Sequence, residues 1–231
     1  METKGRPSVA LAFYVLPCSL FSKVISYFRA MDKNVIETLR KLTGKRDARV
    51  LIVPHISPDG DAAGACSALW QVMDKLGVEC HLMTCDYFPE YLKWLKRIPD
   101  SVSYQQHPIR CKRWLQEADV LFMLDHNTMA REGDLEPFTR EYKGNVVMID
   151  HHPDPDEVTL CVSDTRVSST CELLYDVITS TWGKEIIDTD IANALYTGIS
   201  TDTGGLNHNS SRPETYLVIA RLLEAGLDKA Y

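Results

Sequence analysis

The sequence predicts an α/β fold, built on a mostly parallel sheet with helices on both faces. Three apolar runs, at 50–53, 120–124 and 146–149, have the length and composition of buried strands. Segments with helical spacing separate these runs, and such alternation is typical of parallel strands joined by right-handed crossovers. The 231 residues, 45% hydrophobic and 25% charged, suit one large globular domain with a sizeable core.

The first 30 residues differ from the rest of the chain. A polar start with two basic residues precedes an apolar stretch that Pro17 interrupts, and this stretch is too short to span a bilayer. We expect residues 1–30 to be a non-essential extension, with Met31 as an alternative start, and residues 31–231 to be the folded domain. A secretory signal peptide is the other interpretation, although no Ala-x-Ala cleavage site follows.

The helices and strands of residues 31–231 are expected from their periodicity and their caps. Gly44, Gly77 and Gly226 end helices, Pro213 begins one, and Ser169 starts a capping box. The predicted helices are 33–43, 60–76, 89–97, 109–118, 136–142, one capped by 168–170 that ends at 182, one that Asp190 opens and that passes through 199, and one that begins at 213. The predicted strands are 48–54, 78–84, a short one within 99–108, 120–125, 146–149 and 160–162.

Acidic and imidazole side chains follow the predicted strands. Asp150, His151 and His152 end one apolar run, and similar side chains follow two others and precede a Gly-Gly turn. The carboxyl ends of parallel strands meet at one edge, where open α/β sheets bind ligands. The residues that could converge there are His55, Asp59, Asp61, Asp125, His151 and Asp202. Such a donor set suits manganese, iron or zinc. Alternatively, one histidine of 151–152 caps its strand and the other lies on the surface.

Charge and cysteine content restrict the function. The net charge of −7 argues against tight, sequence-independent binding of long duplex DNA, although cations bound to the acids would offset part of it. The seven cysteines are odd in number, irregularly spaced and without a Cys-x-x-Cys pair. We expect reduced thiols, mostly in the core, in a reducing cytoplasm, rather than a disulfide framework or a thiolate zinc site. We expect no association with membranes.

The ordered motifs resemble the DHH phosphoesterase superfamily. They are His55-x3-Asp59-x-Asp61, Asp125, the Asp-His-His of 150–152 and Asp202 before its glycine turn. Residues 55–62 and 210–216 are most similar to the nanoRNase branch, which comprises oligoribonucleases that also act as pAp phosphatases and are related to RecJ. The resemblance covers roughly Met31 to the end of the chain.

The resemblance implies a role for each of these residues. One cation would be held by His55, Asp59 and Asp125, and a second by Asp61, Asp125, His151 and Asp202, with Asp125 as the bridge. We expect two Mn2+ per chain, with Fe2+, Co2+ or Mg2+ as alternatives. The expected catalytic residues are His152, which would contact the phosphate or protonate the leaving group, and Asp150, which would orient an imidazole or cap its strand.

Three further residues lie near these motifs. His208 and Arg212 lie just past the last motif and are candidates for binding substrate phosphate, although a solvated surface position is the alternative for Arg212. His126 follows Asp125 and would point to the opposite side of an extended strand. It is therefore expected to be structural.

The function implied by the resemblance is metal-dependent, two-metal hydrolysis of phosphate esters. The expected substrates are short oligoribonucleotides, 3′,5′-bisphosphate nucleosides such as pAp, or both. The alternatives are an inorganic pyrophosphatase of the same superfamily and a non-catalytic domain that binds metal or nucleotide without a substrate clamp. Homodimerisation stays open. Family members carry a C-terminal substrate-binding domain with a Gly-Gly-Gly-His type motif. That motif is missing from this sequence, so we expect the domain to be absent or truncated.

Overall fold

The computed structural model describes residues 31–229 and contains a six-stranded sheet in the order β3-β2-β1-β4-β5-β6. Every neighbouring pair of strands is parallel. The strands are β1 (Arg49–Pro54), β2 (Glu79–Thr84), β3 (Val102–Ser103), β4 (Val120–Leu124), β5 (Asn145–Asp150) and β6 (Leu160–Ser163). The predicted α/β fold with a parallel sheet is confirmed.

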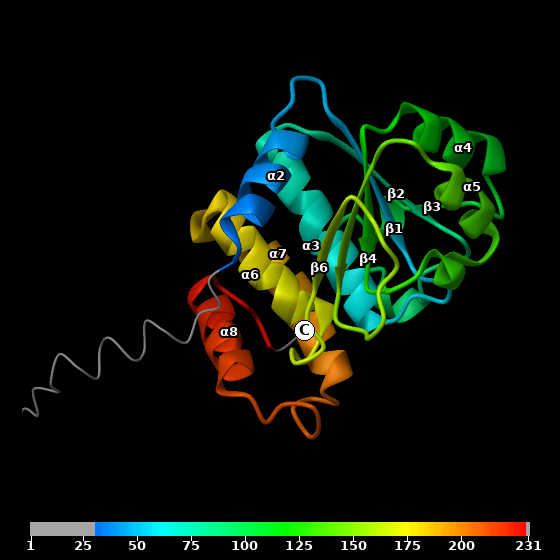
Figure 1. Cartoon of the computed structure of the whole chain (residues 1–231). Coiled ribbons are helices and arrows are strands. Elements are labelled where there is room, and N and C mark those ends of the chain that lie inside the picture. Colours follow the sequence, from blue (N-terminus) through cyan, green and yellow to red (C-terminus); the bar gives the residue numbers. More distant parts are fainter. Residues whose placement is uncertain (1–30, 230–231) are drawn as a thin grey trace, which may run out of the picture.

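Helices cover both faces of this sheet, as the sequence predicted (Figure 1). The larger core lies beneath α2 (Lys33–Thr43), α3 (Gly60–Leu76), α6 (Thr170–Trp182), α7 (Thr189–Asp202) and α8 (Pro213–Glu224). The smaller core lies beneath α4 (Pro108–Glu117) and α5 (Glu136–Glu141). Short 3-10 segments connect these elements at Glu90–Leu92, Ile98–Asp100, Met129–Leu135 and Lys184–Ile186.

The central strands are apolar throughout because each strand buries both of its faces. In β1, Val50 and Ile52 belong to the larger core, whereas Leu51 and Val53 belong to the smaller one. Successive side chains of a strand point to opposite faces, so a strand covered on both sides shows a continuous apolar run instead of alternation. This is why the strand ends could be read from the first polar residue after each run.

The order of the strands creates a switch point between β1 and β4. The chain leaves β1 through α3 on one face and returns into β4 through α4 on the other face. Neighbouring strands whose connections run to opposite faces leave a crevice at their carboxyl ends, and this crevice is the usual ligand site of open α/β sheets. His55 follows β1 and Asp125 follows β4, so the two residues flank this point.

The prediction of a helix over 89–97 is wrong. The chain instead forms consecutive 3-10 turns, in which the amide of residue 95 bonds the carbonyl of 92 and the amide of 98 bonds the carbonyl of 95. Leu92, Leu95 and Ile98 are buried at a spacing of three, which matches a 3-10 helix rather than an α-helix. Arg97 adopts a left-handed backbone (φ 73°) and precedes the 3-10 segment Ile98–Asp100.

The cap of α7 also differs from the prediction, since it lies two residues earlier. Asp188, and not Asp190, caps the helix, because its carboxylate accepts the Ile191 amide at 3.1 Å. Asp190 lies within the first turn, where its side chain pairs with Lys96.

Two remaining expectations concern thiols and membranes. The six cysteines of the described region are free, and all but Cys161 are buried, as expected for reduced core thiols. Cys18 and the extension predicted over 1–30 lie outside the described residues. Between residues 31 and 229, no helix is both long and apolar enough to cross a membrane.

Candidate metal centre

The six residues singled out from the sequence converge at the carboxyl edge of the sheet. His55 follows β1, Asp125 follows β4 and His151 follows β5, while the aspartates come from the start of α3 and the end of α7. Their donor atoms form two groups, each with all its atoms within 4.8 Å of one another. The first group is His55, Asp59 and Asp125, and the second is Asp61, His151 and Asp202.

The first group contains an imidazole nitrogen that lacks a hydrogen-bond partner. The Nδ1 of His55 donates to the carbonyl of Ile56 at 2.7 Å, which leaves the lone pair on Nε2. That Nε2 is buried and has no hydrogen-bond partner among the described residues. It lies 3.5 Å from Oδ2 of Asp125 and 3.9 Å from Oδ1 of Asp59. An imidazole nitrogen without a hydrogen-bond partner that faces two carboxylates across such gaps fits a ligand group for a cation.

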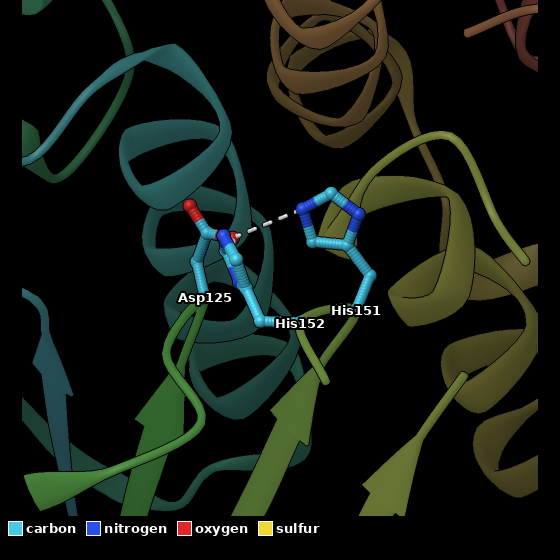
Figure 2. A group of neighbouring side chains, drawn as sticks. All are labelled: Asp125, His151 and His152. Carbon is cyan, nitrogen blue, oxygen red and sulfur yellow. Dashed lines mark ion pairs between the residues drawn. The ribbon is translucent and has the colours of Figure 1, made fainter. Parts of the chain in front are cut away.

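The second group has the same pattern around His151. Its Nε2 lies 3.3 Å from Oδ2 of Asp202, 3.8 Å from Oδ1 of Asp125 and 3.9 Å from Oδ2 of Asp61. Figure 2 shows the Asp125 side chain and the two histidines that follow β5. Asp125 thus directs Oδ2 toward His55 and Oδ1 toward His151. Its carboxylate lies between the two groups, where a bridging ligand would be.

The N-terminus of α6 holds Asp61, a feature missed at the sequence level. The two carboxylate oxygens of Asp61 accept the amides of Thr170 and Cys171 at 2.6 and 2.9 Å. The hydroxyl of Thr170 donates to Asp125 at 2.9 Å. A helix N-terminus offers free amides to an anion. Ser169 was recognised as the cap, but nothing in the sequence shows that Asp61, more than 100 positions away, is the anion.

The capping box predicted at this helix forms only in part. The Ser169 hydroxyl accepts the Glu172 amide at 3.0 Å, as expected. The Glu172 carboxylate does not return to Ser169. It accepts bonds from the amide and hydroxyl of Ser168 and from the hydroxyl of Thr215. Glu172 therefore ties α8 to the turn before α6 and so fixes the helix that holds Asp61.

Close helix packing brings α7 against the site. A Cβ added at Gly198 would lie 2.3 Å from Oδ1 of Asp61 and 2.4 Å from Sγ of Cys171. A Cβ at Gly60 would lie 2.4 Å from the Thr201 side chain. These two glycines let α3 and α7 approach closely enough for Asp61 and Asp202 to meet His151.

The crowded carboxylates perturb one another's ionisation. Burial raises the pKa of Asp61 well above its usual value, and the charges of Asp125 and Asp202 add to the effect. Burial, with the charges of Asp125 and Asp59, raises the pKa of Asp202 to about 7. Burial opposes the charged form of His55, but the neighbouring carboxylates of Asp125 and Asp59 favour it more strongly and raise its pKa to about 10. Negative charge is therefore in excess within this cluster, and bound cations would offset it.

His152 is held differently from His151. Its Nδ1 donates to Oδ1 of Asp150 at 2.7 Å, and its amide donates to Oδ2 of the same residue at 2.9 Å. The hydrogen bond that His152 donates to Asp150 raises the pKa of His152. The side chain is 34% exposed and its Nδ1 lies 4.0 Å from Asp125, so a third group of potential ligands joins it to Asp125 and His151. Because Asp150 engages Nδ1, Nε2 is the ring nitrogen left for other contacts.

The other two residues that were predicted to bind substrate are not bonded to this cluster. Among residues 31–229, neither His208 nor Arg212 forms a hydrogen bond or ion pair with any of the six. Arg212 pairs with Glu214 at 3.5 Å. Their loop nevertheless runs beside α6, since the Asn209 side chain donates to the Ser168 carbonyl at 2.9 Å.

His126 points away from the cluster, as expected, but for a different reason. The prediction assumed an extended strand through Asp125. In fact β4 ends at Leu124, and Asp125 has a left-handed backbone with φ 63°. His126 is fully buried and bonds Leu124 and Glu132.

The chain is similar to a known family, to curated sequences and to solved structures. The family model described as "DHH family, N-terminal domain" matches residues 49–199. A bifunctional oligoribonuclease and PAP phosphatase NrnA from Thermus thermophilus is 30% identical over 200 residues, which are 85% of this chain and 55% of that protein. A probable bifunctional oligoribonuclease and PAP phosphatase NrnA from Streptococcus mutans is 27% identical, over 78% of this chain and 54% of that protein.

This chain is also similar to a solved structure. An exopolyphosphatase-related protein from Bacteroides fragilis superposes with a TM-score of 0.84 at 32% identity, covering 87% of this chain and 59% of that one. The chain therefore spans a little more than half the length of the relatives it matches.

Proposed function

Because this chain belongs to the DHH family, we propose that it is a metal-dependent phosphoesterase whose active centre is the cluster at the carboxyl edge of its sheet. The observation that carries the proposal is the pair of ligand groups separated by one carboxylate. His55, Asp59 and Asp125 would hold one cation, and Asp61, His151 and Asp202 would hold the other, with Asp125 shared. A phosphate ester needs this arrangement because its own negative charge repels nucleophiles.

Two adjacent divalent cations, when bound, would clamp phosphoryl oxygens and acidify the attacking water. The residues of the chain supply the rest. Four aspartates and two imidazoles offer a mixed oxygen and nitrogen donor set, which favours Mn2+ over Mg2+. The amides of α6 that bond Asp61, and the Ile56 carbonyl that bonds Nδ1 of His55, orient these two ligands.

His152 is proposed as the acid that serves the leaving group. Asp150 holds its Nδ1 at 2.7 Å and raises its pKa, so the ring keeps a proton more readily on Nε2. It stands beside Asp125, within 4.0 Å, and is partly exposed, so it can reach a substrate that the cluster binds. Asp150 would act through His152, as a positioning residue.

The proposed substrates are short oligoribonucleotides and 3′,5′-bisphosphate nucleosides such as pAp. The names of the two NrnA relatives support this choice, as does the net charge of −7, which disfavours long polyanions but not short ones. Phosphate binding by Arg212 and His208 stays part of the proposal, because their loop is tied beside α6.

The proposal is tested by assaying purified protein, loaded with Mn2+, on ribonucleotides of two to five residues, on pAp and on pyrophosphate. We expect release of mononucleotides from the short RNAs and of phosphate from pAp, and Asp125→Asn should abolish both. Pyrophosphate hydrolysis exceeding nucleotide hydrolysis by orders of magnitude would favour the pyrophosphatase alternative. Calorimetric binding of pAp without turnover, in protein shown to contain metal, would indicate the non-catalytic alternative.

A further inference from the structure

A buried histidine–glutamate pair lies directly behind the cluster and contributes no ligand to it. His126 and Glu132 are both 0% exposed, and Nε2 of His126 lies 3.0 Å from Oε1 of Glu132. The other ring nitrogen, Nδ1, bonds the Leu124 carbonyl at 2.9 Å. Glu132 belongs to the 3-10 segment Met129–Leu135, and its Oε2 has no partner among the described residues.

This pair is a poor source of stability. Removing two charged groups from water costs about as much as their attraction returns, and apolar residues of similar size often stabilise a core equally well. An unsatisfied carboxylate oxygen adds a further cost. The pair therefore contributes little to stability, and its contacts with neighbouring residues are the more informative feature.

The histidine–glutamate pair lies against the backbone turn at Asp125. This residue has φ 63°, a left-handed backbone that costs most L-residues energy and that aspartate tolerates better than most. His126 follows the turn and contacts both sides of it. Its ring bonds the carbonyl of Leu124, just before the turn, and the carboxylate of Glu132, after the turn. The turn sends Asp125 toward Thr170 on α6, at 2.9 Å, and His126 toward Glu132.

The same 3-10 segment also holds the end of β1. The carbonyl of Arg131 accepts the Ile56 amide at 2.7 Å. The carbonyl of Ile56 in turn accepts Nδ1 of His55 at 2.7 Å. One segment therefore contacts both strand ends that supply the first ligand group, through Arg131 on one side and Glu132 on the other.

We propose that His126 and Glu132 are a positioning pair for the metal centre, which holds Asp125 so that each of its oxygens faces one ligand group. The inference rests on the proposed function, because it assigns the pair a role toward the cations. Without the pair, Asp125 is free to relax toward an extended backbone, and its carboxylate then turns away from His55 and His151.

The test replaces both members with leucine, so that no unpaired charge stays buried. The His126→Leu/Glu132→Leu variant should fold, as judged by circular dichroism of the metal-free protein, and should melt close to the wild-type temperature. Its affinity for Mn2+, measured by titration calorimetry, should nevertheless fall about 10- to 100-fold, the usual effect of losing groups that orient metal ligands. Gln71→Leu is the matched control. It also removes a buried polar side chain, but about 15 Å along α3 from Asp61, and its affinity for Mn2+ should match wild type.

The outcomes separate this inference from the proposed function. Wild-type protein that binds no Mn2+ would refute both. Wild-type binding together with an unchanged affinity in the folded double variant would refute the positioning role alone. If the double variant does not fold, His126→Gln replaces it, because glutamine can still reach Glu132 but gives up the bond to Leu124. A folded His126→Gln protein should lose at least tenfold affinity, and undiminished binding would again refute the role.

Discussion

Asp125 is the residue on which the proposed centre depends most. Its two oxygens face the two histidines of different ligand groups, at 3.5 Å and 3.8 Å. Asp125→Asn keeps the size of the side chain and its tolerance of a left-handed backbone, but removes the shared negative charge. We expect the loss of at least one Mn2+ per chain and of activity by several orders of magnitude, measured by elemental analysis and turnover. Retention of two metals and near-normal turnover would remove the bridging role.

His152 should separate catalysis from metal binding. Its Nδ1 is engaged by Asp150, so it is the one histidine of the pair 151–152 that we do not assign to a cation. His152→Ala should lower kcat by about 10²- to 10⁴-fold, as expected for a lost general acid, while the Mn2+ content stays at the wild-type value. Loss of metal from this variant would show that His152 is a ligand instead, in the third group with Asp125 and His151.

At the scale of residues, the sequence indicated which side chains meet but not how each is held. The first polar residue after each apolar run marked Asp125 and Asp150, because buried parallel strands are apolar until they reach the edge. The left-handed turn at Asp125 could not be predicted, since its contacts are made with distant parts of the chain, such as the Ile149 carbonyl, which accepts the Asp125 amide at 3.2 Å. The contact between Asp61 and the amides of α6 is likewise a product of tertiary packing.

At the scale of elements, the close contact of α7 with α3 and α6 sets the position of Asp61. Gly198→Ala places a methyl group 2.3 Å from its Oδ1, which must move. We expect a loss of about 1–3 kcal/mol in stability from overpacking, together with weaker Mn2+ binding. Thermal melting of the metal-free protein and calorimetric titration measure the two effects.

Gly64→Ala is the control for this change. Its added Cβ would lie 2.4 Å from the Ala194 carbonyl, so it should also destabilise the contact between α3 and α7. Gly64 lies one turn beyond Asp61, and the three atoms nearest its Cβ would belong to Ala194, Cys171 and Gly198 rather than to that carboxylate. If both variants weaken Mn2+ binding to the same extent, the effect belongs to helix packing in general and not to displacement of Asp61.

Elements were predictable where one period dominated the pattern. The strands and the helices around Gly60–Leu76 and Thr170–Trp182 were expected close to their observed positions, because caps and apolar spacing agree there. The segment 89–97 failed because Leu92, Leu95 and Ile98 recur every three residues, and short sequences do not separate this spacing from an α-helical one. Its actual conformation is fixed by packing against the core.

At the scale of the whole molecule, the cluster should couple metal binding to stability. Ligands from β1, α3, β4, β5 and α7 meet at one point, so cations there bind the folded chain but not the unfolded one. Mn2+ at a hundredfold excess over its Kd should stabilise the fold by about 2.7 kcal/mol, which raises Tm by at least about 5 °C for a chain of this size. Calorimetric scans with Mn2+ and with a chelator measure this shift, and identical Tm values would contradict it.

The most direct test of the account is to locate the metal by anomalous scattering, in crystals grown with Mn2+ and measured at the manganese edge. We predict two peaks about 4 Å apart. One should be bound by His55, Asp59 and Asp125, and the other by Asp61, His151 and Asp202, with Asp125 touching both. A single peak, two distant peaks, or manganese bound away from Asp125 would contradict the account.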